Sequence, residues 1–243
     1  MSTVELLNEL FENLSSPKVK KVNPTVIFNE GWMTRVLVEI SIKEQLKIGN
    51  IDFSKLHNWS SEALIDSPFV TVKEKREGYT HADIILGDFE IDYSQKGKIE
   101  VNKNAQILGI IEAKMGSNLS QRTNNADDYN QASRNICCLA YNTLKAHGHC
   151  NIFFIVVAPQ STIKKYDIEF QIENTTLKNQ IIRRYETSNE KLGQDLLKKI
   201  EDNKNNILTI SYEEWINKIK NQTDKKLLNN FYNNCLKHNK ILK

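Results

Sequence analysis

Two short apolar stretches, His81-Ala-Asp83-Ile-Ile-Leu-Gly87 and Gly109-Ile-Ile-Glu112-Ala-Lys114-Met-Gly116, carry charged residues where buried strands are expected. Because side chains alternate across a strand, Glu112 and Lys114 project from the same face of the second stretch. Pairing of the two strands would place Asp83 beside them. Buried charges are costly to desolvate and are seldom retained for stability alone. The three residues therefore indicate a chemical site held by a sheet, in preference to a buried ion pair.

The segments around these two strands predict an α/β fold with a mixed sheet flanked by helices. Apolar residues recur at helical spacing on either side of a group of three strands, which is expected to form an antiparallel meander. A further run that is apolar on both faces is typical of a covered central strand. The expected elements are a helix over residues 30–49, strands at 69–72, 81–89 and 106–115 with a hairpin extension at 99–101, a helix over 125–146 and a strand at 151–158.

The chain is expected to fold as one domain with two additions to its core. Residues 1–28 hold an amphipathic helix and a basic loop, residues 29–160 form the core, and residues 161–243 form a helical extension with a short strand at 207–211. The 243 residues are 40% hydrophobic and 26% charged, which is typical of a globular protein. No run is long enough to span a bilayer and no targeting signal is found, so we expect a cytoplasmic protein that does not bind membranes.

Two carboxylates and a lysine that converge on one site are suited to the hydrolysis of phosphodiesters. Asp83 and Glu112 offer the hard oxygen ligands that Mg²⁺ prefers, with Mn²⁺ as a substitute. A bound metal polarises the phosphoryl group and lowers the pKa of water. Lys114 is a compact cation that would orient the attacking water or stabilise charge on the phosphate.

The order helix, three strands, helix, strand, with Asp83 on the second strand and Glu112-Ala-Lys114 on the third, resembles the PD-(D/E)XK nuclease superfamily, the restriction-endonuclease-like fold. The resemblance covers residues 29–159, and Ala82 stands where the family's name has Pro. It implies that Asp83 and Glu112 bind a divalent metal and that Lys114 assists the nucleophilic water.

The resemblance also implies supporting residues on the two core helices. An acid on the first helix is expected, with Glu30 as the choice and Glu39 as the alternative. On the second helix, Gln131 and Arg134 would hydrogen-bond Lys114 or a substrate phosphate, although an ordinary solvated helix face explains either residue equally well. Weaker candidates for contact with nucleic acid are Lys73, Arg76 and Arg134.

We therefore expect a Mg²⁺-dependent endonuclease that acts on DNA, most simply a type II-like restriction or defence nuclease. A homodimer is expected because two subunits are needed to cut both strands symmetrically. No GxxxxGK[ST] loop is found, so no nucleotide cofactor is expected. Elements that read a recognition sequence are expected in residues 50–67 and after Pro159. The alternatives are a repair, recombination or phage nuclease acting on ends or branches, and a non-catalytic binding module of the same fold.

Overall fold

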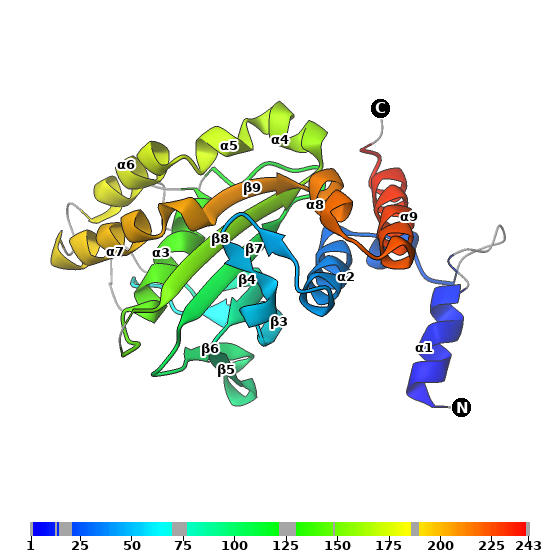
Figure 1. Ribbon diagram of the computed structural model, residues 1–243, viewed down its shortest axis with the longest axis horizontal. Helices are drawn as coiled ribbons and strands as arrows, with labels where there is room; N and C mark the ends of the chain where they lie inside the picture. Colours follow the sequence, from blue (N-terminus) through cyan, green and yellow to red (C-terminus); the bar gives the residue numbers. More distant parts are fainter. Residues whose placement is uncertain are drawn as a thin grey trace.

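A mixed sheet of seven strands lies at the centre of the molecule (Figure 1). This computed structural model describes residues 2–12, 14, 21–69, 77–121, 130–147, 149–185 and 190–241. The strand order is β5-β6-β3-β4-β7-β8-β9. The strands are β3 (Asn58–Ile65), β4 (Thr80–Gly87), β5 (Phe89–Asp92), β6 (Lys98–Val101), β7 (Ile107–Ala113), β8 (Asn151–Ala158) and β9 (Ile207–Ser211), beside a separate ribbon of β1 (Lys47–Ile48) and β2 (Ile51–Asp52).

The direction of the strands changes across the sheet. β3, β4 and β7 pair antiparallel, whereas β7, β8 and β9 run parallel. Seven of the eight residues of β8 are buried, because parallel strands are covered on both faces. The carboxyl ends of β7, β8 and β9 therefore meet at one edge of the sheet.

Helices cover the two faces of the sheet as two groups (Figure 1). One apolar cluster joins the sheet to α3, α6 and α7, and a second joins the opposite face to α2, α8 and α9. No helix in the described ranges is both long and apolar enough to cross a membrane. The helices are α1 (Thr3–Glu12), α2 (Glu30–Lys43), α3 (Gln131–Thr143), α4 (Gln160–Tyr166), α5 (Ile168–Gln171), α6 (Asn174–Tyr185), α7 (Glu190–Asp202), α8 (Tyr212–Lys218) and α9 (Gln222–His238).

The predicted α/β class, the mixed sheet and most of the central elements are confirmed. β4, β7 and β8 lie where strands were expected, and the hairpin between the second and third strands is present as β5 and β6. The short strand predicted at 207–211 is β9, which adds the C-terminal region to the edge of the central sheet.

The prediction for the first strand of the meander is wrong. The strand that pairs with β4 is β3, which lies within residues 50–67, where elements that read a recognition sequence were expected. Its first five residues, Asn58 to Glu62, are exposed or half-buried, and only Ala63 to Ile65 are buried. The strand therefore lacks the apolar alternation that a sequence search detects. Of the predicted segment 69–72, Phe69 lies in a turn and residues 70–72 are outside the described residues.

Both core helices are shorter than predicted. α2 ends at Lys43 instead of near residue 49, and the backbone of Gln45 then takes a left-handed φ of 52° that turns the chain into β1. α3 begins at Gln131, where the side chain of Asn130 caps the helix by accepting a hydrogen bond from the Ser133 N–H. Residues 122–129, which include the predicted start at 125, lie outside the described residues.

Candidate active site

The candidate site lies where β4 and β7 separate. Their antiparallel pairing ends at Ile84 and Ile111, whereas β7 stays paired with β8 through Ala113. The Ala113 N–H donates instead to Oδ2 of Asp83 at 2.8 Å. A side-chain carboxylate thus takes the place of a neighbouring strand's carbonyl, which satisfies the backbone donor.

A distortion of β3 and β4 positions Asp83 at this point. The two strands pair at Ser61 with Ile84 and again at Ala63 with Ala82, so Glu62 lies opposite Asp83. Glu62 has a left-handed φ of 56°, which few residues other than glycine adopt. The regular pairing of β3 with β4 is therefore interrupted at Glu62 and Asp83, and Asp83 is the residue whose carboxylate belongs to the candidate site.

The N-terminus of α2 brings a second carboxylate to the end of β7. Glu30 is the first residue of the helix, and Asn29 caps it by accepting a hydrogen bond from the Trp32 N–H at 3.0 Å. Oε2 of Glu30 accepts a hydrogen bond from the Met115 N–H at 2.5 Å. A carboxylate at this position also interacts favourably with the positive end of the helix dipole.

Glu112 is fully buried and accepts hydrogen bonds at both oxygens. Oε1 accepts from Lys114 Nζ and from Gln131 Nε2, each at 2.6 Å, and Oε2 accepts from Asn135 Nδ2 at 2.8 Å. Gln131 and Asn135 lie four residues apart, on one face of α3. The Thr80 hydroxyl donates to Oδ1 of Asn135 at 2.7 Å, which leaves the amide nitrogen to face the carboxylate. Asn135 and Thr80 were not assigned a role from the sequence, although the i, i+4 spacing from Gln131 was the available signal.

The charges of this cluster interact strongly because they are shielded from water. Burial, with the nearby charge of Asp83, raises the pKa of Glu112 to about 8. Burial also raises the pKa of Glu30, although the Met115 N–H and Lys114 oppose the shift. For Lys114, burial alone would lower the pKa, but attraction to the surrounding carboxylates outweighs it and raises the pKa. The ammonium of Lys114 therefore stays charged at neutral pH, and Glu112 holds its proton more tightly than an ordinary carboxyl group does.

The donor set fits a hard divalent cation held by a few carboxylates. Glu30, Asp83 and Glu112 would together carry more negative charge than Lys114 neutralises, and carboxylate oxygens suit Mg²⁺, which is usually held by one or two carboxylates with water and phosphate in its other positions. Within the described ranges, no three His, Cys, Asp or Glu side chains are arranged to hold a metal by themselves. A metal held by two of these carboxylates would take oxygens of water and substrate in its other positions.

A cleft opens beside this cluster, at the carboxyl end of β7. It has a volume of about 630 Å³ and includes Glu30 and Met115 in its wall. Lys165 of α4 and Lys240, just after α9, are exposed lysines on its rim. A ligand in this cleft would reach Glu30 directly while lying next to two positive charges.

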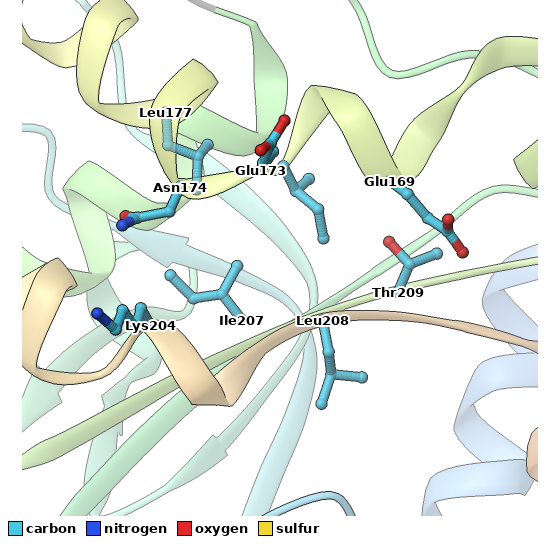
Figure 2. Close-up of a pocket in the computed structure, with 9 residues that line it drawn as sticks. Glu169, Glu173, Asn174, Leu177, Lys204, Ile207, Leu208 and Thr209 are labelled. Carbon is cyan, nitrogen blue, oxygen red and sulfur yellow. The ribbon is translucent and has the colours of Figure 1, made fainter.

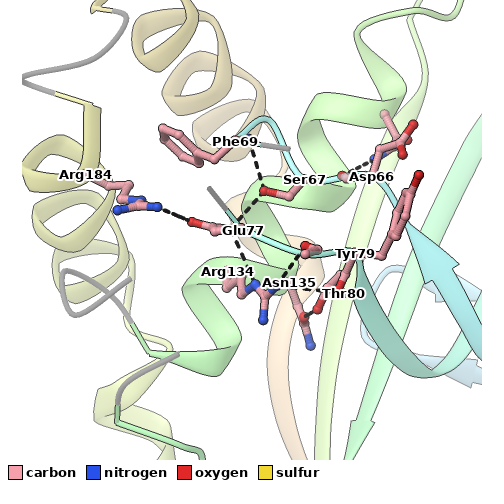
Figure 3. Close-up of polar contacts among 11 residues, drawn as sticks. Asp66, Ser67, Phe69, Glu77, Tyr79, Thr80, Arg134, Asn135 and Arg184 are labelled. Carbon is pink, nitrogen blue, oxygen red and sulfur yellow. Dashed lines mark hydrogen bonds and ion pairs between the residues drawn. The ribbon is translucent and has the colours of Figure 1, made fainter. Parts of the chain in front are cut away.

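A buried ionic cluster supports α3 and the residues that lead into β4 (Figure 3). Glu77 is 1% exposed, and its Oε1 accepts hydrogen bonds from Arg184 of α6, at 2.6 Å from Nη2 and 3.1 Å from Nε. Its Oε2 accepts from Ser67 at 2.8 Å and lies 3.4 Å from Nε of Arg134 on α3. The cluster ties Glu77 to two helices only three residues before Thr80, whose hydroxyl orients Asn135.

The structure brings together the main predicted residues and places others elsewhere. Asp83, Glu112, Lys114, Glu30 and Gln131 form one cluster, as described above. The alternative acid, Glu39, instead accepts a hydrogen bond from Trp59 at 3.1 Å and pairs with Lys43. Arg134 donates to the carbonyl of Gly78 at 3.0 Å in addition to its contact with Glu77. Its role in binding nucleic acid stays a prediction, and Lys73 and Arg76 lie outside the described residues.

A second cavity, of about 310 Å³, lies between β9 and the α5–α6 region (Figure 2). Glu169, Glu173 and Lys204 are among its lining residues, and Oδ1 of Asn174 and Oγ1 of Thr209 are buried there without a hydrogen-bond partner. None of the clustered carboxylates lines this cavity. The clustered carboxylates therefore adjoin the cleft at Glu30 and not this cavity.

We expect Arg184→Met to lower the free energy of unfolding by about 3–5 kcal/mol, because it removes one partner of a buried ion pair. The control is Lys178→Met on the same helix, since Lys178 pairs with Glu201 at the surface and should contribute at most about 1 kcal/mol. Urea denaturation of both variants measures the difference. Equal losses would show that the Glu77 cluster does not stabilise this part of the fold.

Comparison with known proteins does not identify a family. No protein-family model matches the chain, and no match is found among curated proteins or solved structures. The arrangement of Glu30, Asp83, Glu112 and Lys114 is therefore the basis on which a function is inferred.

Proposed function

We propose that this protein is a Mg²⁺-dependent nuclease that hydrolyses phosphodiester bonds in DNA, built on a core of the PD-(D/E)XK type. The observation that supports the proposal is the convergence of Glu30, Asp83, Glu112 and Lys114 where β4 and β7 separate. Perturbed acids that cluster beside a cleft are more typical of a functional site than of a stabilising one.

Each residue of the cluster has a distinct part in the proposed reaction. Asp83 and Glu112 would hold the Mg²⁺, which when bound supplies charge stabilisation and a lowered pKa of water. Lys114 stays protonated, so its ammonium is suited to orient the attacking water or to stabilise charge on the phosphate. Gln131 and Asn135 hold the Glu112 carboxylate from α3, so that its position changes little during the reaction.

The cleft at the end of β7 is the proposed route of the substrate. Its rim lysines, Lys165 and Lys240, would offset the repulsion between a phosphate backbone and the carboxylates. Glu30 lies in the cleft wall and links this basic rim to the cluster. A backbone phosphate passing through the cleft would therefore come next to the catalytic groups.

Among the biological roles, we favour a type II-like restriction or defence nuclease. Discrete fragments from long duplex DNA would support this role, and mapping of their ends would give the recognition sequence. Cleavage of ends or branched DNA without a fixed sequence would favour a repair, recombination or phage nuclease. Binding without cleavage of any substrate would favour a non-catalytic module.

Purified protein is expected to cleave DNA in the presence of Mg²⁺ and to lose cleavage when the metal is chelated. Lys114→Met should lower the rate by about 10²–10⁴-fold, as for the loss of one group that assists proton transfer or orients the nucleophile. Asp83→Asn should abolish cleavage, because it removes a proposed metal-binding carboxylate, while the amide oxygen still accepts the hydrogen bond from Ala113. Gel electrophoresis of duplex, single-stranded and branched DNA and of RNA measures the activity, and filter binding measures the affinity.

The control for Lys114→Met is Lys98→Met, which removes a lysine that pairs with Asp66 at 3.1 Å in the same sheet. Its cleavage rate should match that of the unaltered protein. Cleavage by Lys114→Met at an undiminished rate would exclude the proposed role of Lys114.

Metal affinity is expected to rise with pH up to about 8. Glu112 is largely protonated below its pKa of about 8, and it must lose this proton to bind a metal. The apparent affinity for Mn²⁺ should therefore increase by up to about tenfold per pH unit between pH 6 and 8 and level off above. Calorimetry in two buffers of different ionisation enthalpy measures the released proton. The same slope in Glu112→Gln would show that another group is responsible.

Replacing both rim lysines, in Lys165→Ala/Lys240→Ala, should weaken DNA binding and lower its salt dependence. Each phosphate contact that is lost reduces the slope of log K against log salt by about 0.9. The measurement uses Ca²⁺ in place of Mg²⁺ to limit cleavage. The control is Lys103→Ala/Lys191→Ala, which removes two exposed lysines that do not line the cleft. An equal loss of slope in both variants would contradict the proposed route.

A further inference from the structure

Helix α1 has an apolar face that the rest of the molecule does not cover. Val4, Leu7 and Phe11 follow one another at helical spacing, and they are 66%, 44% and 39% exposed. The helix buries none of its ten residues and stands apart from the other elements (Figure 1). An isolated helix of this length is marginal in water, so α1 needs a surface on which its apolar face can pack.

A groove of matching character lies on α9. It has a volume of about 420 Å³, and Leu227, which is 48% exposed, contributes an apolar side chain to it. The rings of Phe28 and Phe231 meet edge to face in the groove, with their centroids 5.2 Å apart. Polar residues complete the lining: Thr223, Lys226, Asn230 and Asn234.

Charge and length both suit α1 to this groove. α1 carries Glu5, Glu9 and Glu12 and no basic residue, whereas α9 carries three lysines, at 225, 226 and 237, against one acid, Asp224. At 1.5 Å per residue, the apolar face from Val4 to Phe11 spans about 10 Å. The groove residues from 223 to 234 span about 16 Å on the same basis, which is long enough to hold this face.

No residue of α1 lines this groove within the same chain, so the groove is available to a second copy. Only residue 13 separates α1 from Leu14, which is 5% exposed. As placed in this structure, α1 leaves its apolar face exposed and does not cover the α9 groove of the same chain. Two α1 helices packed together would place their glutamates side by side, and an anionic membrane or a nucleic acid would repel the same glutamates.

We propose that α1 of one subunit docks into the α9 groove of a second copy, and that the exchange is reciprocal. An amphipathic helix in an apolar groove is a common mode of recognition, and a two-fold axis would generate two identical contacts in a closed dimer. None of the clustered carboxylates lines this groove, and the proposed dimer contact does not rest on the proposed nuclease activity.

Cross-linking between introduced cysteines tests the exchange directly. The native cysteines at 137, 138, 150 and 235 are all buried, so mild oxidation would act on new thiols at the surface. Chains with Leu7→Cys are mixed with chains with Leu227→Cys and analysed on a non-reducing gel. We expect a disulfide-linked dimer in the mixture and none with either variant alone.

The other arrangements predict different bands. A dimer formed by Leu7→Cys alone would indicate that two α1 helices pair. An internal disulfide in a single chain that carries both Leu7→Cys and Leu227→Cys would indicate docking within one chain. Absence of any cross-link, together with a monomeric mass in sedimentation, would also overturn the proposal.

The mass of the unmodified chain in solution gives an independent readout. The chain should sediment as a dimer, and Phe11→Asp should shift it to a monomer, because a charge would then have to be buried in the groove. The control is Leu144→Asp, which places the same charge at an apolar residue that is 41% exposed after α3. A dimer that persists in Phe11→Asp, or dissociates equally in Leu144→Asp, would contradict a contact through α1.

Discussion

The candidate site exists because β4 separates from β7 where their pairing ends. Beyond Ile84 and Ile111 the two strands no longer pair, so the backbone of β7 needs other hydrogen-bond partners. Two carboxylates supply them, as Asp83 accepts from Ala113 and Glu30 accepts from Met115. Unpaired backbone donors in a buried position are costly. The same need therefore holds two acids next to the end of a rigid strand.

The third acid is held in a different way. Glu112 lies in the buried part of β7 and meets α3, where Gln131 and Asn135 occupy one face. A buried carboxyl with this environment has its pKa raised toward neutrality. A divalent cation would restore the ionised form and compensate the excess negative charge. The excess negative charge thus lowers the stability of the protein alone but raises its affinity for a metal. Perturbed carboxylates of this kind are common in functional sites.

The supporting structure reaches well beyond the cluster itself. Glu77 joins Arg184 on α6 to Arg134 on α3, and the chain then continues into Thr80 at the start of β4. Thr80 orients Asn135, which in turn contacts Glu112. The position of the Glu112 carboxylate is therefore linked to the packing of α3 and α6.

Local features of this protein can be read from its amino-acid sequence. The α/β class, β4, β7, β8 and the same-face placement of Glu112 and Lys114 all follow from apolar runs and from alternation along a strand, which depend only on neighbouring residues. β3 could not be found in this way, because most of its residues are polar or half-buried and its pairing with β4 is non-local. Tertiary packing brings Glu30, and not Glu39, into the cluster and places Asn135 and Thr80 beside it. These contacts arise from the separation of two strands and the packing of α2 and α3 against them, which no local pattern encodes.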